Sequence, residues 1–258
     1  MIKLTRINST NLNAPKLFII PGGPGLSSLT LRSLDILNRS FELIYLDFPG
    51  TNDNPYTGKK SFSELSTELS NLIQHESGIK YILGHSFGGF LAADAMINRL
   101  VSGLVCISTP FSQQSLFEVN NNYSEKMTPE LLQAESNWLV NGDDLSFSKW
   151  LAEYGNLYFK ISSGKELILG DKVSSLFFKD NRSDALNKDL MLPFLQKTKK
   201  RKIFICGTND ELLPPNILKK DAELGGFDFF EIDNASHFVT YDQPEKVASL
   251  IEEQLLRP

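Results

Sequence analysis

The sequence predicts an α/β fold in which a mostly parallel sheet carries helices on both faces. The alternation of two kinds of segment leads to this prediction. Short apolar runs, as expected for strands buried on both faces, alternate with amphipathic segments of helical periodicity. This alternation is typical of parallel sheets whose strands are connected by helices. The length of 258 residues suits one large domain, or a core with a modest insertion.

Five strands are expected in the first part of the chain, each a short apolar or alternating run. They cover residues 2–7, 17–20, 43–46, 81–83 and 104–107. Ser27 or Ser28 is expected to cap the helix that follows the second strand. Ser61 and Glu64 have capping-box spacing and begin the next helix. A further helix follows the glycine pair at 88–89.

The alternation stops between residues 111 and 200, where the chain is helical in tendency, rich in aromatic residues and without a buried-strand run. It resumes directly afterwards, with strands at 202–206 and 227–232 and helices beginning at Pro215 and Gln243. We therefore expect a core, residues 1–110 and 201–258, and a helical cap, residues 111–200, inserted after the sixth core strand. A separate helical domain without a role at the site is the alternative.

Composition and charge exclude several classes of function. The formal net charge is −5, and the basic run at 199–202 is interpreted as a solvated loop, so nucleic acid is not an expected partner. The N-terminus lacks the apolar core of a signal peptide, and no stretch approaches the roughly 20 apolar residues of a membrane span. We expect a cytoplasmic protein with no membrane contact. Cys106 and Cys206 lie in predicted strands and are interpreted as buried apolar residues, not as a disulfide or metal site.

Ser86 is the candidate nucleophile because it lies in a Gly-x-Ser-x-Gly pattern between a predicted strand and a predicted helix. Such a strand-to-helix turn is tight and holds its serine in a strained backbone conformation. Gly84 and Gly88 flank it because a Cβ at either place would strike the neighbouring strand or helix. The following helix points its N-terminus at any anion that develops there.

A serine hydroxyl needs a base to remove its proton, and the chain has three histidines. His75 lies late in a predicted helix and is interpreted as a surface residue. His85 adjoins the serine but should project to the other side of the turn. His237 lies in the loop after the last strand, at the same end of the sheet as Ser86, and is the expected base.

The base in turn needs a carboxylate that fixes its tautomer and stabilises its charged form. Asp210 follows the preceding strand, again at the C-terminal end, and is the expected acid. Glu211 is the near alternative, and Asp233 and Asp242 are more distant ones. The order serine, aspartate, histidine along the chain is the order expected for this architecture.

An acyl-transfer enzyme also binds an oxyanion, commonly with two backbone N–H groups. The N–H of Phe87, directly after the nucleophile, is one candidate. The N–H of Gly23, in the glycine- and proline-rich loop after the second strand, is the other.

Taken together, these motifs resemble the α/β-hydrolase superfamily, from about Leu17 to the C-terminus and excluding the cap. They are Pro-Gly-Gly-Pro-Gly at 21–25, Gly-His-Ser-Phe-Gly-Gly at 84–89, Gly-Thr-Asn-Asp-Glu-Leu-Leu-Pro at 207–214, and Ser-His-Phe at 236–238 with the following Asp-Gln-Pro-Glu. More particularly, the Gly-Gly-Pro-Gly loop resembles that of the prolyl aminopeptidases (proline iminopeptidases) and their relatives.

The chain departs from that branch at several places. Pro21 stands where the family usually has histidine. The turn that carries the serine reads Gly-His-Ser-Phe-Gly, the form seen in general esterases and C–C hydrolases, whereas the family usually has Gly-Gly-Ser-Trp-Gly. Asp-Phe-Pro-Gly at 47–50 replaces Asp-Gln-Arg-Gly, and the family's initial antiparallel strands are shortened. An aminopeptidase also needs a cap carboxylate for the substrate's ammonium group. The available glutamates are Glu118, Glu125, Glu130, Glu135 and Glu153.

The resemblance implies a serine hydrolase, of aminopeptidase or carboxylesterase type, that forms an acyl-enzyme on a small ester, amide or N-terminal prolyl peptide bond. The expected partner is a small molecule or short peptide, and no metal or organic cofactor is expected. Trp138, Trp150 and Glu153 are candidate substrate-binding residues of the cap. A lyase or cofactor-free oxidative activity on the same triad is one alternative, and a non-catalytic ligand receptor is another. The sequence does not predict the oligomeric state.

Overall fold

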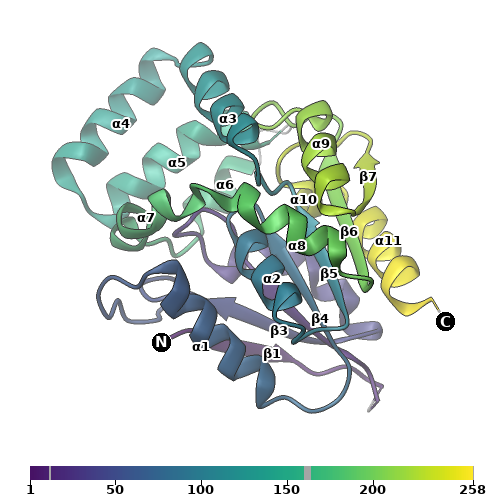
Figure 1. Cartoon of the computed structure of the whole chain (residues 1–258). Coiled ribbons are helices and arrows are strands. Elements are labelled where there is room, and N and C mark those ends of the chain that lie inside the picture. Colours follow the sequence, from purple (N-terminus) through teal and green to yellow (C-terminus); the bar gives the residue numbers. More distant parts are fainter. Residues whose placement is uncertain (12, 160–163, 258) are drawn as a thin grey trace.

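The computed structural model describes residues 1–11, 13–159 and 164–257, and within them a seven-stranded sheet runs in the order β1-β3-β2-β4-β5-β6-β7 (Figure 1). β1 (Lys3–Ile7) pairs antiparallel with β3 (Glu42–Asp47). The remaining pairings are parallel and involve β2 (Lys16–Ile20), β4 (Lys80–His85), β5 (Gly103–Ile107), β6 (Arg201–Gly207) and β7 (Asp228–Ile232). This confirms the predicted mostly parallel sheet.

The central strands form where the sequence has continuous apolar runs, because both of their faces are covered. All five residues of β5 are buried, as are Leu17–Ile20 of β2. The register pairs Gly84 with Cys106, and Cys106 with Phe204. The loops that follow β4, β5 and β6 therefore leave the sheet at one edge, where functional groups of such sheets gather.

Helices cover both faces of the sheet (Figure 1). One face carries the 3₁₀ helix η1 (Ser28–Arg39), α10 (Val239–Asp242) and α11 (Pro244–Leu256), whose apolar side chains pack in one cluster. The other carries α1 (Phe62–Gln74), α2 (Gly88–Ile97), α8 (Leu192–Lys197) and α9 (Pro215–Gly225). Ser27 caps η1 by accepting from Leu29 N (3.1 Å), and the Ser61–Glu64 capping box is present at α1.

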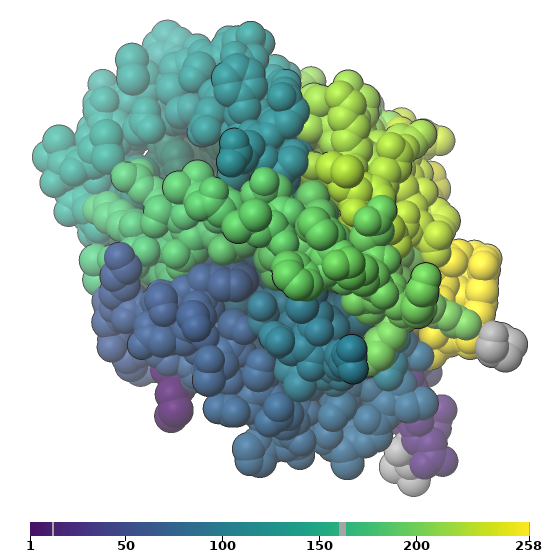
Figure 2. All heavy atoms as spheres, viewed as in Figure 1, coloured from purple at the N-terminus to yellow at the C-terminus, as the bar shows by residue number. Residues whose placement is uncertain are grey.

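The chain between β5 and β6 forms a succession of helices in the described residues. They are α3 (Gln113–Glu125), α4 (Pro129–Asn141), α5 (Asp144–Tyr158), α6 (Gly164–Leu169), α7 (Ser175–Asn181), η2 (Arg182–Ala185), η3 (Lys188–Met191) and α8. Helices α3 to α7 lie beyond the sheet, and Figure 2 shows them as a lobe seated on the rest of the molecule. They follow β5, the fifth strand along the described chain. The expectation of a place after the sixth core strand is therefore wrong by one strand, because five strands precede α3 in the described part of the chain.

None of the helices in the described residues is long and apolar enough to cross a lipid bilayer. The cap has an aromatic interior of its own, in which Trp138, Phe147, Trp150 and Phe178 pack ring against ring.

Candidate active site

Ser86 lies on a tight turn between β4 and α2, with a φ of +48°. This left-handed conformation is strained for a residue with a side chain, and it persists only where the surroundings enforce it. The Ser86 N–H donates to the carbonyl oxygen of Ile107 (2.7 Å), which fixes the turn to the neighbouring strand. The Ser86 side chain is half-buried.

The two glycines of the pattern are required by close backbone contacts. A Cβ on Gly88 would lie 2.5 Å from the carbonyl oxygens of Ile20 and Pro21, and a Cβ on Gly84 would overlap the Gly88 carbonyl. Neither place admits a larger residue without a shift of backbone. The start of α2 therefore approaches the end of β2 closely.

The glycine-rich loop after β2 lies against the nucleophile. A Cβ on Gly22 would be 3.2 Å from the Ser86 Cβ, and Gly23 has a φ of +111°, a conformation that favours glycine. Within the described residues, the N–H groups of Gly23 and Phe87 have no intramolecular hydrogen-bond partner. Phe87 immediately precedes α2, so its N–H lies at the positive end of that helix.

The structure brings His237 and Asp210 together from the loops after β7 and β6. Asp210 Oδ2 accepts from His237 Nδ1 at 2.9 Å, and both side chains are buried. Asp210 Oδ1 accepts from the N–H groups of Leu212 (3.0 Å) and Leu213 (2.8 Å), which hold the carboxylate in place. The proton on His237 is thereby fixed at Nδ1, which leaves Nε2 as the basic nitrogen.

The alternative acids lie elsewhere. Glu211 is exposed and forms an ion pair with Lys126, and Asp233 is exposed. Asp242 accepts from the N–H of Ser236 (2.7 Å), so it stabilises the loop that carries the histidine without touching the imidazole in any described contact.

His85 is buried beneath the site and is not placed to act as the base. Its Nε2 donates to the carbonyl oxygen of His237 (3.1 Å), and the two rings are 5.0 Å apart. Burial, and then the neighbouring His237, lower the pKa of His85 to about 3, so it is neutral. It therefore joins the serine turn to the histidine loop. His75 is exposed at the end of α1, where its Nδ1 lies 2.6 Å from the carbonyl oxygen of Asn71.

The cap contacts the histidine loop through the last turn of α5. The Tyr158 ring stacks on His237, with ring centroids 5.2 Å apart and planes 26° apart. The Tyr158 carbonyl oxygen accepts from Ser236 Oγ (2.8 Å) and from the Phe238 N–H (3.4 Å). The aromatic character of the cap was predicted from the sequence, but Tyr158 was not among the residues selected for the site.

The signal that could have found Tyr158 is helical spacing. Trp150, Tyr154 and Tyr158 recur every four residues and share one side of α5. Their rings form a continuous series from the cap interior to His237: Trp150 stacks on Tyr154 (5.4 Å), and Tyr154 meets Tyr158 edge to face (4.6 Å).

The three cap residues selected from the sequence differ in their surroundings. Trp150 belongs to the ring series, and its Nε1 donates to Tyr123 OH (3.1 Å). Trp138 is 2 % exposed, stacks on Trp150 (4.6 Å) and donates to Ser175 Oγ (2.8 Å), so it is part of the cap interior. Glu153 forms an ion pair with Lys165 (3.0 Å).

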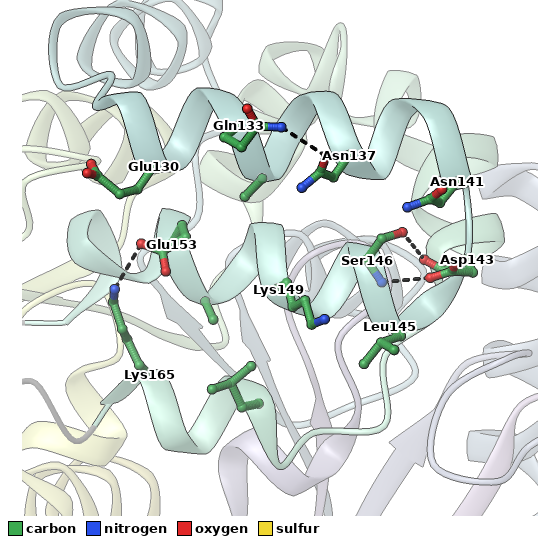
Figure 3. Close-up of a pocket in the computed structure, with 13 residues that line it drawn as sticks. Glu130, Gln133, Asn137, Asn141, Asp143, Leu145, Ser146, Lys149, Glu153 and Lys165 are labelled. Atoms are coloured by element: carbon green, nitrogen blue, oxygen red, sulfur yellow. Dashed lines mark hydrogen bonds and ion pairs between the residues drawn. The ribbon is translucent and has the colours of Figure 1, made fainter.

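Glu153 and Lys165 line a groove of about 630 Å³ among α4, α5 and α6 (Figure 3). In Figure 3, Glu130, Gln133 and Asn137 lie along α4, which forms one wall. The groove belongs to the cap, and Ser86, Asp210 and His237 are not among its lining residues.

Two buried carboxylates hold the loop that carries Gly23. Asp47 accepts from Ser28 N (2.7 Å) and Ser28 Oγ (3.0 Å). Asp171, from the cap, accepts from Ser27 N (3.0 Å) and from Ser27 Oγ. Burial raises the pKa of Asp171 to about 6. Hydrogen bonds to Asp47 of the sheet and to Asp171 of the cap therefore hold the loop from two sides.

The arrangement can support nucleophilic acyl transfer. It places a strained serine, a histidine oriented by a carboxylate, and two N–H groups without a hydrogen-bond partner among the described residues at one edge of the sheet. Among the residues that the structure describes, no group of three or more His, Cys, Asp or Glu side chains could hold a metal ion.

Comparisons with known proteins agree with the fold described above. The sequence matches the model of the "Alpha/beta hydrolase family" over residues 17–250. A search of curated proteins finds no match to the sequence. Among solved structures, an esterase from Thermogutta terrifontis is 18% identical with a TM-score of 0.73, and the alignment covers 99% of this chain and 93% of that one.

Two further structures have related shapes. A proline iminopeptidase-related protein from Thermus thermophilus is 17% identical with a TM-score of 0.75, over 99% of this chain and 93% of that one. A proline iminopeptidase from Mycobacterium smegmatis is 14% identical with a TM-score of 0.63, and the alignment covers 99% of this chain and 93% of that one. At these identities, the likeness establishes the fold alone.

Proposed function

Because the chain belongs to the α/β hydrolase family, we propose that it is a serine hydrolase that cleaves a small ester, amide or N-terminal peptide bond through an acyl-enzyme. The observation that carries this proposal is the buried Asp210–His237 pair beside a serine with a φ of +48°. His85 precedes the serine directly and contacts His237, so the base and the nucleophile belong to one cluster.

In the proposed acylation step, Ser86 Oγ attacks the substrate carbonyl carbon while His237 Nε2 takes the hydroxyl proton. The carbonyl π electrons move onto oxygen, and the N–H groups of Gly23 and Phe87 bind the oxyanion that results. The carbonyl then re-forms, the bond to the leaving group breaks, and His237 returns the proton to the departing alcohol or amine. Asp210 stabilises the imidazolium throughout.

In the deacylation step, water replaces the leaving group and attacks the acyl-enzyme. His237 takes a proton from the water and returns it to Ser86 Oγ as the acid is released. The net reaction is the addition of one water across the ester or amide bond.

Within this class, the described cap residues support acyl esters and simple amides over N-terminal peptides. An aminopeptidase needs a carboxylate for the substrate's ammonium group, yet the candidate glutamates are engaged elsewhere or exposed. Glu153 pairs with Lys165, Glu118 accepts from Gln114, Glu125 accepts from Asn121, and Glu130 is exposed at the groove of Figure 3. Glu135, the remaining one, interacts with the Tyr123 hydroxyl.

Turnover of two fluorogenic panels tests the proposal: acyl esters of increasing chain length, and amino-acyl amides including the prolyl one. Ser86→Ala is the blank for both. We expect ester cleavage that depends on Ser86. Cleavage of the prolyl amide alone would contradict the preference for esters, and Ser86→Ala with unchanged activity would contradict the mechanism itself.

A further inference from the structure

We propose that Tyr158 of the cap is a positioning residue for the general base, and that the face of its ring stabilises the imidazolium form of His237 during acyl transfer. This inference rests on the proposed function, because it assigns a role to Tyr158 in the step in which His237 becomes charged.

The geometry supports a stacking role. The two rings are nearly parallel, at 26°, with centroids 5.2 Å apart, so the tyrosine presents its π face to the imidazole. A cation within about 6 Å of an aromatic centroid is attracted by the ring quadrupole, and the attraction is larger when both partners are desolvated. His237 is 1% exposed.

The ring is held in place by other contacts. The Tyr158 carbonyl oxygen accepts from both neighbours of His237, Ser236 and Phe238. The Tyr158 hydroxyl is hydrogen-bonded to Tyr154, and burial raises the pKa of Tyr158 well above its usual value, so the phenol stays neutral. The backbone contacts survive a change of side chain, and Tyr158→Phe, which lacks only the hydroxyl bonded to Tyr154, is the reference for the effect of the ring.

Three other titratable groups are relevant to the charge of His237. Asp210 is hydrogen-bonded to Nδ1 and favours the imidazolium. His85 is neutral, since its pKa is about 3. Tyr154 is neutral because burial raises its pKa. The strength of the Tyr158 contact can therefore be varied without changing a formal charge beside the base, while Phe238, whose ring meets His237 edge to face at 5.9 Å, stays in place.

Two histidines besides His237 must be separated from it in a titration. His85 does not titrate near neutral pH, and exposed His75 can be removed by His75→Gln.

The test is a graded series at position 158. Tyr158→Phe keeps the ring face, and replacement by mono-, di- and trifluorinated phenylalanines weakens the quadrupole with little change of shape. We expect the pKa of His237 to stay near the wild-type value in Tyr158→Phe and then to fall stepwise with fluorine number, by about 0.4 to 1.5 in total. The same series at Tyr154, one ring further from His237, is the matched control and should leave this pKa unchanged.

A pKa of His237 that does not change along the 158 series, or that changes equally along the 154 series, would overturn the proposal. Labelling of Ser86 by a fluorophosphonate is measured on the same proteins. If the wild-type chain is not labelled, the proposed function fails. If it is labelled and the pKa of His237 does not change along the substitutions at position 158, only the role of Tyr158 fails.

Discussion

At the scale of single residues, Asp210 determines which nitrogen of His237 carries the proton. Its Oδ2 accepts from His237 Nδ1, while Oδ1 is held by the N–H groups of Leu212 and Leu213. An asparagine could keep the Oδ1 contacts, but its Nδ2 would face Nδ1 and select the tautomer protonated at Nε2. Asp210→Asn should therefore lower kcat by roughly 10⁴-fold, measured on the best ester of the panel.

The control for this substitution is the neighbouring acid. Glu211 is exposed and pairs with Lys126, so Glu211→Gln should leave kcat near the wild-type value. A loss of comparable size in Glu211→Gln would show that the wrong carboxylate has been assigned.

Gly88 is a second residue at which the structure predicts the effect of a substitution, in this case on stability. A Cβ there would lie 2.5 Å from two carbonyl oxygens, so Gly88→Ala forces the start of α2 away from β2. We expect a loss of about 1–3 kcal/mol in the free energy of unfolding, as for an overpacked core, measured by urea denaturation.

Gly155→Ala is the matched control, because a Cβ at Gly155 in α5 meets its nearest neighbour at 3.6 Å, an ordinary contact. Equal destabilisation of the two variants would mean that the close approach at Gly88 does not constrain the turn.

Residues that the parallel strands bring together at one edge of the sheet could be selected from the sequence. Ser86, Asp210 and His237 each follow a strand, and the C-terminal ends of parallel strands meet at one edge. Tyr158 and Asp171 could not be selected in this way. Ser27 and Asp171 are 144 residues apart along the chain, and their contact depends on how the cap is seated on the core.

At the scale of elements, the strands were predictable because burial on both faces requires continuous apolar runs. The helix after β2 was predicted from its cap and its apolar spacing, yet it is a 3₁₀ helix. Periodicity does not separate the two forms over so short a segment, because both place residues three apart on nearly the same face. The cap helices could be predicted as helical, but their contacts with the loops could not.

The contact between the cap and the Gly23 loop should make the stability of the fold depend on pH, because it is formed by Asp171. Its pKa is about 6 in the folded chain, above the ordinary 3.8, because the carboxyl group is buried. The folded state thus binds the proton more tightly than the unfolded state. The associated stability is complete below about pH 4 and is lost as the pH rises through 6.

Asp171→Asn removes this ionisation while keeping one acceptor oxygen for the Ser27 N–H. Relative to the wild type, the variant should gain stability between pH 4 and pH 7, by an amount on the order of 3 kcal/mol, measured as the free energy of unfolding in urea. Asp53→Asn, at an exposed ion pair with Lys172, is the control. A difference between Asp171→Asn and the wild type that does not vary with pH would contradict this account.

At the scale of the whole molecule, the fold assembles one site from distant parts of the chain. The sheet supplies the turn at Ser86 and the loops of Asp210 and His237. The cap contacts the His237 loop through Tyr158 and the Gly23 loop through Asp171. The family membership could be predicted from the combined motifs of the core. The substrate could not, because fold similarity does not determine what a site binds.

The most direct test of the central claim is covalent labelling with a fluorophosphonate, read by mass spectrometry of the intact chain and of its peptides. The account predicts a single adduct on Ser86, none on Ser86→Ala, and labelling slowed by several orders of magnitude in His237→Ala. A folded wild-type chain that takes no label, or takes it at another residue, would contradict the assignment of Ser86 as an activated nucleophile.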